Sequence, residues 1–79
     1  MRVSLFGPQA AAVGAAHVEL DLAPPCRCAQ VRDALRRTAP ALANSLDAAR
    51  LAVNHRFAPE DHLINTGDEV ALIALVSGG

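Results

Sequence analysis

The chain has 79 residues, with seven arginines, no lysines and eight acidic residues, which give a formal net charge of −1. Roughly a quarter of the residues are Leu, Ile, Val or Phe, above the ~20% below which disorder is common, so one small core can form. The near-neutral charge and an aromatic content of 3% argue against nucleic-acid binding, which needs a basic surface and stacking aromatics. No apolar run approaches the ~18 residues of a membrane span and no signal peptide is visible, so we expect a soluble cytoplasmic protein.

The first part of the chain predicts two short strands joined by a connection. In residues 2–6, Val3 and Leu5 recur with period two, which is typical of a half-buried strand. Residues 7–16 begin with Gly-Pro and contain a further glycine, so we interpret them as a connection. Residues 17–22 alternate polar and apolar side chains throughout and predict a second strand.

The middle of the chain predicts the main helix, over residues 28–40. Val31 and Leu35 are four residues apart, and two arginines near the end suit the negative pole of a helix. Pro40 ends this helix, and residues 41–46 are expected to add a second helical turn.

The last part of the chain predicts two more strands. Residues 50–54 alternate again, and Asn54-His55 is a plausible turn. Residues 56–69 are interrupted by a proline and a glycine and are expected to be irregular, apart from one short strand. Residues 69–76 are apolar on both faces, which indicates a strand in the middle of a sheet.

This order of elements predicts an α+β fold of the β-grasp, or ubiquitin-like, type. The expected sheet is mixed, with one main helix on one face, and its last strand lies parallel to the first because the helix supplies the crossover. Residues 1–76 would form this domain, and residues 77–79 would be a flexible C-terminal tail that ends in Gly-Gly.

Two cysteines, Cys26 and Cys28, are separated by one residue. A disulfide across so short a loop would be strained, and a zinc site needs about four ligands. The three histidines do not match a zinc spacing. We therefore expect no metal and interpret the two cysteines as small residues at a helix entrance.

Four motifs follow one another along the chain: "RVSLFG", "VRDALRR", "AVNHRF" and "DHLINTGDEVALIALVSGG". In this order, and with a Gly-Gly end, they resemble the sulfur-carrier proteins over essentially the whole chain. Within that family the chain is most similar to the small subunit of molybdopterin synthase. The last motif is the most specific, because its Gly-Asp turn and its Val-Ser-Gly-Gly end both sit where the family places such residues.

The resemblance implies that the C-terminal carboxylate of Gly79 carries the function. An adenylating enzyme of the E1-like class would activate that carboxylate with ATP, and sulfur would then convert it to a thiocarboxylate. The tail, including Ser77 and Gly78, would enter the large subunit of molybdopterin synthase in a heterotetramer. There it would donate sulfur to the pyranopterin precursor of the molybdenum cofactor. The chain itself would bind no cofactor stably, and partners would supply the catalytic side chains.

The resemblance also implies a partner-binding patch that contains Phe6, Phe57, Ile73 and Leu75. The strand periodicity agrees with it: if Val3 and Leu5 face the helix, Phe6 lies on the open face of the sheet. An apolar cluster on an open face favours partner binding. The alternative for Phe57 is that it caps a small core.

Other functions stay open at this point. Ala74 and Leu75 stand where the molybdopterin branch usually carries two prolines, so the chain could carry sulfur for thiamin or cysteine biosynthesis. It could also be a ubiquitin-like protein modifier. His55 and His62 are candidate acid–base groups, but no nucleophile or carboxylate pair is placed by the sequence to act with them.

Overall fold

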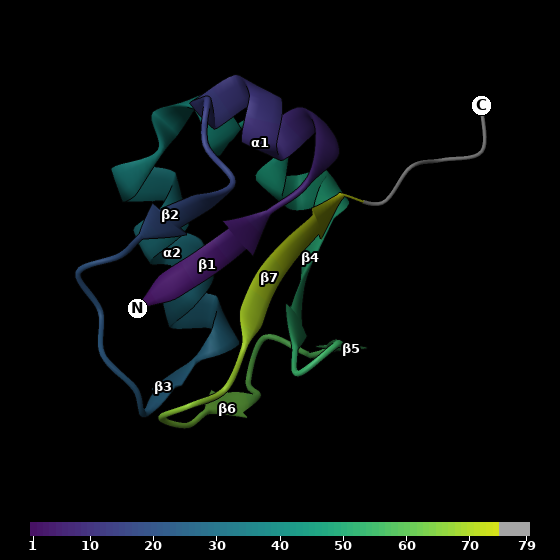
Figure 1. The fold of residues 1–79 in the computed structure, drawn as a ribbon. Coiled ribbons are helices and arrows are strands. Elements are labelled where there is room, and N and C mark those ends of the chain that lie inside the picture. The colour runs from purple at the N-terminus through teal and green to yellow at the C-terminus, as the bar shows by residue number, and fades with distance from the viewer. Residues whose placement is uncertain (75–79) are drawn as a thin grey trace.

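The computed structural model describes residues 1–74 (Figure 1). Its elements, in chain order, are β1 (Arg2–Leu5), α1 (Gly7–Val13), β2 (His17–Glu19), β3 (Cys26–Arg27), α2 (Cys28–Thr38), the 3₁₀ turns η1 (Pro40–Leu42) and η2 (Leu46–Ala48), β4 (Ala49–Val53), β5 (Arg56–Phe57), β6 (Leu63–Ile64) and β7 (Val70–Ala74). The predictions made for Leu75, Ser77, Gly78 and Gly79 lie outside the described residues.

Five strands form one mixed sheet in the order β2-β1-β7-β4-β5. β7 is parallel to β1, with Val3 opposite Val70, and the other neighbours in this sheet are antiparallel. The predicted β-grasp topology, with the last strand parallel to the first, is confirmed. β3 and β6 form a separate antiparallel pair that the sequence analysis did not anticipate.

One face of the sheet is covered by α2, which lies behind it in Figure 1. The inward side chains of the three central strands are buried because their positions alternate with period two. α2 buries Val31 and Leu35 against them, as its helical spacing predicted. The most deeply buried side chains are Val3, Cys28, Val31, Leu35, Leu42, Leu46, Leu51, Ile64 and Leu72.

The interpretation of residues 7–16 as a connection is wrong in part, because α1 occupies the first seven of these residues. Pro8 fits the first turn of a helix, where a missing N–H costs nothing, and the alanines that follow are the strongest helix formers. Gly14 ends α1 in the left-handed region, at φ 79°, and its N–H donates to the Ala10 carbonyl over 2.8 Å. The same glycine that suggested a loop is therefore a helix cap.

Cys26 and Cys28 are buried free thiols at the junction of β3 and α2. Burial raises the pKa of both thiols, so neither forms a thiolate readily at neutral pH. Among residues 1–74, no three His, Cys, Asp or Glu side chains come together in a group that could hold a metal ion. No helix in that part of the chain is long and apolar enough to cross a membrane.

Candidate functional site

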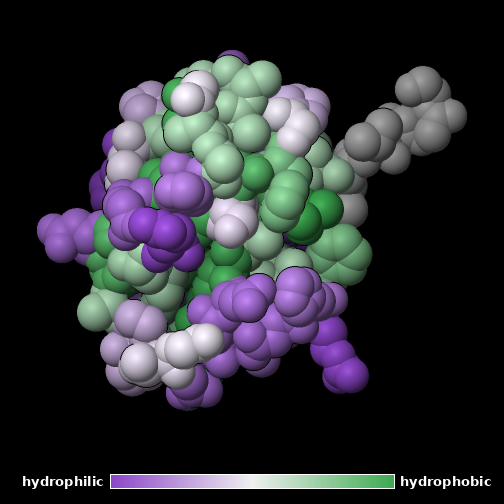
Figure 2. All heavy atoms as spheres, viewed as in Figure 1, coloured by the Kyte–Doolittle hydropathy of each residue, from purple (hydrophilic) through white to green (hydrophobic). Residues whose placement is uncertain are grey.

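The face of the sheet opposite α2 carries a shallow apolar depression. A row of small side chains crosses it: Ser4, Ala71 and Ala52 are cross-strand neighbours on β1, β7 and β4. Phe57 on β5 ends this row, as the partner of Ala52. In Figure 2, which views this face, hydrophobic side chains gather over the middle strands above a band of hydrophilic ones.

The depression has a volume of about 350 Å³. Phe6, Phe57 and Ile73 contribute its large apolar side chains, while Ser4, Ala52 and Ala71 contribute small ones. Phe6 is 56% exposed and Phe57 is 51% exposed. Large aromatics left half in water beside a hollow are unusual on a monomer that has nothing to bind.

The structure therefore brings together three of the four residues predicted for partner binding: Phe6, Phe57 and Ile73. The fourth, Leu75, lies outside the described residues. The exposed ring of Phe57 excludes the alternative in which it caps the core. β7 runs directly along this face toward residue 75, so the depression lies beside the strand that leads to the tail.

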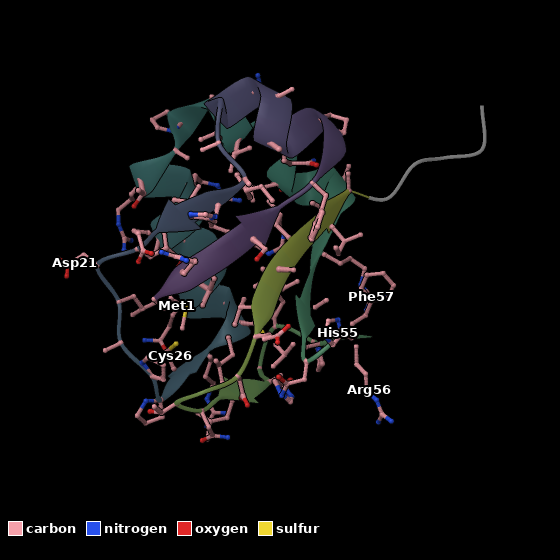
Figure 3. The ribbon with its side chains drawn as sticks, in the orientation of Figure 1. Met1, Asp21, Cys26, His55, Arg56 and Phe57 are labelled. Atoms are coloured by element: carbon pink, nitrogen blue, oxygen red, sulfur yellow. The ribbon has the colours of Figure 1, made fainter. Side chains whose placement is uncertain are left out.

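The position of Phe57 depends on the tight turn between β4 and β5. Asn54 and His55 both have positive φ, 52° and 68°, which is the geometry of a two-residue hairpin turn. Asparagine tolerates this region better than most residues because its short polar side chain bonds locally. The predicted Asn54-His55 turn is present, and Figure 3 shows His55, Arg56 and Phe57 together at this hairpin.

A hydrogen-bond network holds that turn against the loop before β7. The Asn54 N–H donates to the Glu69 carbonyl over 2.8 Å, and the Glu69 N–H donates to Asn54 Oδ1 over 3.0 Å. Asn54 Nδ2 donates to Asp68 Oδ1 over 3.0 Å, while the Asn65 N–H donates to Asp68 Oδ2 over 2.8 Å. The bonds from Asn65 and Asn54 lower the pKa of the Asp68 carboxyl, because they stabilise its charged form. Through these hydrogen bonds, the loop with the Gly-Asp turn stabilises the β4–β5 hairpin.

Ionisable side chains stand at the edges of the depression. His55 Nε2 lies 3.2 Å from Glu69 Oε2, and both of these residues line the depression. On the other side of Phe57, the guanidinium carbon of Arg50 lies 4.8 Å from the centre of its ring. The sequence analysis missed Arg50, whose only signal was its place two residues before Ala52 on the same face of β4.

This arrangement of exposed apolar side chains around a hollow is suited to binding. His55 is paired with an exposed carboxylate, and no Cys side chain lines the depression. His62 is exposed and is not among the lining residues. Ser4 lines the depression together with His55, and within the described residues no hydrogen bond joins the two side chains.

The ThiS family model matches residues 3–79, which is nearly the whole chain. The chain belongs to the ThiS family. No curated protein matches it. As a ThiS-family protein with a ubiquitin-like β-grasp fold, it is of the sulfur-carrier or ubiquitin-like modifier type.

Solved structures of similar proteins agree with this assignment. SAMP1 from Haloferax volcanii is 29% identical, with a TM-score of 0.82 over 100% of this chain and 98% of the other. A putative molybdopterin converting factor subunit 1 from Pyrococcus furiosus is 19% identical, with a TM-score of 0.80 over 95% of both chains. A complex of subunits 1 and 2 of the molybdopterin-converting factor from Helicobacter pylori matches at 20% identity and a TM-score of 0.69, over 99% of this chain and 96% of the other. The last two likenesses establish the fold alone.

Proposed function

We propose that this ThiS-family chain is a sulfur carrier whose reactive group is the carboxylate of Gly79. The observation that carries the proposal is the family match, which extends through Gly78 and Gly79. The described part of the chain supports it in a second way. It offers an apolar face, suited to a partner, along the strand that leads to the tail.

The chemistry begins with activation of that carboxylate. One carboxylate oxygen attacks the α-phosphorus of ATP on an E1-like adenylating enzyme, which releases pyrophosphate and leaves an acyl-adenylate. Hydrosulfide-level sulfur then attacks the acyl carbon and displaces AMP, which gives the thiocarboxylate. The thiocarboxylate sulfur then displaces a leaving group from a carbon of the acceptor, which gives a thioester. Water cleaves the acyl carbon–sulfur bond, which leaves the sulfur on the acceptor and returns the carboxylate for another cycle. ATP is bound by the partner, so the carrier itself needs no stable cofactor.

Two terminal glycines suit this role for a physical reason. Without a Cβ, a Gly-Gly segment can extend through a narrow channel and take backbone angles closed to other residues. The carbon that reacts is also open to attack. Ordering such a segment in a partner's channel costs conformational entropy, which contacts elsewhere have to offset. The exposed Phe6 and Phe57 beside the depression would supply those contacts.

Within the carriers, we place the chain as the small subunit of molybdopterin synthase, which gives sulfur to the pyranopterin precursor of the molybdenum cofactor. The two molybdopterin-converting-factor structures support this choice, and one of them is a complex with a second subunit. The large subunit would then dock on the depression in a heterotetramer and take the tail into its active site.

The main alternative is a ubiquitin-like protein modifier. It is favoured by the likeness to small archaeal modifier protein 1, at 26% identity and a TM-score of 0.81. The same activated carboxylate would then be attacked by an amine of another protein and form an amide. Carriage of sulfur for thiamin or cysteine biosynthesis is a further alternative, with the same carrier chemistry and a different acceptor.

Intact mass spectrometry of the protein isolated from its native cells tests the proposal. A carrier should show a species that is heavier than the free acid by the difference between one sulfur and one oxygen, located at Gly79. Free acid together with amide adducts on other proteins would instead establish the modifier. Co-purification with a large synthase subunit would support the molybdopterin assignment, whereas co-purification with a thiazole-forming enzyme would exclude it. One residue added after Gly79 should abolish sulfur loading and leave the melting temperature unchanged.

A further inference from the structure

We propose that Arg50 makes the open-face depression selective for a partner segment in which a bulky apolar side chain is flanked by a carboxylate. This inference rests on the proposed function, because it describes the partner that docks while the tail is in use. It adds a charge requirement to a surface that would otherwise bind by apolar burial alone.

The depression is large enough to take an inserted side chain of a partner. Its small residues, Ser4, Ala71 and Ala52, are adjacent in one cross-strand row, with the rings of Phe6 and Phe57 among the other lining groups. Partner residues that fill such hollows at the centre of an interface carry most of its binding energy. An aromatic or leucine side chain matches the apolar lining, and the volume of about 350 Å³ leaves room for it and for part of its neighbours.

Arg50 is held at the edge of this hollow by two neighbours. Its guanidinium lies over the Phe57 ring, at 4.8 Å, and its cross-strand partner on β7 is Ile73. A cation above an aromatic face is attracted to the ring and keeps N–H groups free to donate to other acceptors. The Arg50 cation is therefore held beside the Phe57 ring before any partner arrives.

The carboxylates nearest to Arg50 are engaged elsewhere. Arg50 lines a second, polar groove together with Asp47 and Glu60. Glu60 Oε1 lies 2.7 Å from Arg32 Nε, and Asp47 Oδ1 lies 3.8 Å from Arg36 Nη2. Within residues 1–74, Arg50 has no carboxylate oxygen within 4 Å. A cation with no carboxylate oxygen within 4 Å, next to an apolar hollow, is complementary to an acid on the partner.

The edge of the depression opposite Arg50 is unfavourable for the partner's carboxylate. There the carboxylate of Glu69 already occupies the edge, with its Oε2 3.2 Å from His55 Nε2, so a second carboxylate is disfavoured on that side. Arg56 does not compete for the acid, because its side chain points away from the sheet into solvent in Figure 3. The geometry therefore assigns the acidic group of the partner to the Arg50 side of the inserted residue.

Titration of the isotope-labelled full chain with blocked dipeptides tests this directly by NMR. The probes are acetyl-Phe-Asp-amide and its uncharged isostere acetyl-Phe-Asn-amide. We expect both to shift the backbone amides of Ser4, Ala52 and Ala71, with the aspartyl probe binding about two- to fivefold more tightly, as an exposed ion pair allows. In the Arg50→Gln variant this preference should vanish.

Arg37→Gln is the matched control, because Arg37 is an exposed arginine in the last turn of α2 and is absent from the depression. It loses the same charge and should keep the preference. The proposal is overturned if the two probes bind equally to the unaltered chain, if Arg37→Gln removes the preference as completely as Arg50→Gln, or if neither probe shifts the depression at its solubility limit. None of these outcomes touches the sulfur-carrier proposal, which stands or falls on the mass of the terminal residue.

Discussion

Asn54 stabilises the hairpin beside the binding face in two ways that substitutions can separate. Its backbone takes a positive φ of 52° in the β4–β5 turn, and its side-chain amide bridges that turn to the loop before β7. Replacement by glycine keeps the backbone freedom and removes the bridge. Replacement by alanine removes the bridge and also places a Cβ in an unfavourable backbone region.

The magnitudes of these two effects follow from the contacts. Loss of the 3.0 Å bond from the Glu69 N–H should cost about 0.5–1.5 kcal/mol in Asn54→Gly, and loss of the bond to Asp68 adds to this. Asn54→Ala should cost roughly 1 kcal/mol more, because a non-glycine residue in the left-handed region carries a penalty of about 1–2 kcal/mol. In a domain of this size each kcal/mol lowers the melting temperature by about 4–8 °C.

Urea unfolding of the unaltered chain and the two variants, followed by circular dichroism, measures these differences in unfolding free energy. The slope of that free energy against urea concentration should be the same for all three. The expected order of stability is Asn54, then glycine, then alanine. If alanine is as stable as glycine, the backbone-strain argument is wrong. If glycine is as stable as the unaltered chain, the bridge contributes nothing and the hairpin is held by β4–β7 pairing alone.

Three further predictions concern the site and the core. Phe57→Ala should weaken binding of the proposed large subunit by ~2 kcal/mol or more, as for an anchor residue of an interface, which calorimetric titration measures. The free energy of unfolding, measured in urea, should be nearly unchanged because the residue is half exposed. A large loss of stability would show that Phe57 belongs to the core. Gln9→Met should raise the melting temperature by a few degrees, because Gln9 is only 3% exposed and its Oε1 accepts no hydrogen bond within the described chain. A lower melting temperature would show that this oxygen has a partner. Hydrogen bonds lower the pKa of Asp68 from its ordinary 3.8, so its charge stabilises the fold above that value, and this contribution is lost as the pH falls through the lower folded pKa. The difference in unfolding free energy between the unaltered chain and Asp68→Asn should therefore persist from neutral pH to about pH 4 and shrink below it. A difference that is constant with pH would contradict the argument.

Local sequence patterns were enough to predict the main strands, the main helix and which of their faces are buried. Val3 and Leu5, or Val31 and Leu35, lie at the spacing of one face of their element, and burial of apolar surface selects that face in any stable packing. The parallel pairing of the last strand with the first also followed, because few topologies satisfy the order of elements. The same face argument placed Phe6 and Ile73 outward.

The errors came where a local signal has two meanings. Gly14 and the Gly7-Pro8 pair occur equally at loops and at helix ends, so α1 was interpreted as a connection. The β3–β6 pair was missed because its strands are two residues long and separated by more than thirty residues in the chain. Such short strands have no periodicity of their own, and only tertiary contacts define them.

The fold, the family and the apolar character of one exposed face all follow from the amino-acid sequence alone. Which charges border that face depends on tertiary packing. Arg50 meets the Phe57 ring, and His55 meets Glu69, through strand register and a hairpin turn. Periodicity specifies which side of a strand a residue occupies, but the distance between side chains on different strands depends on the packing of the whole sheet.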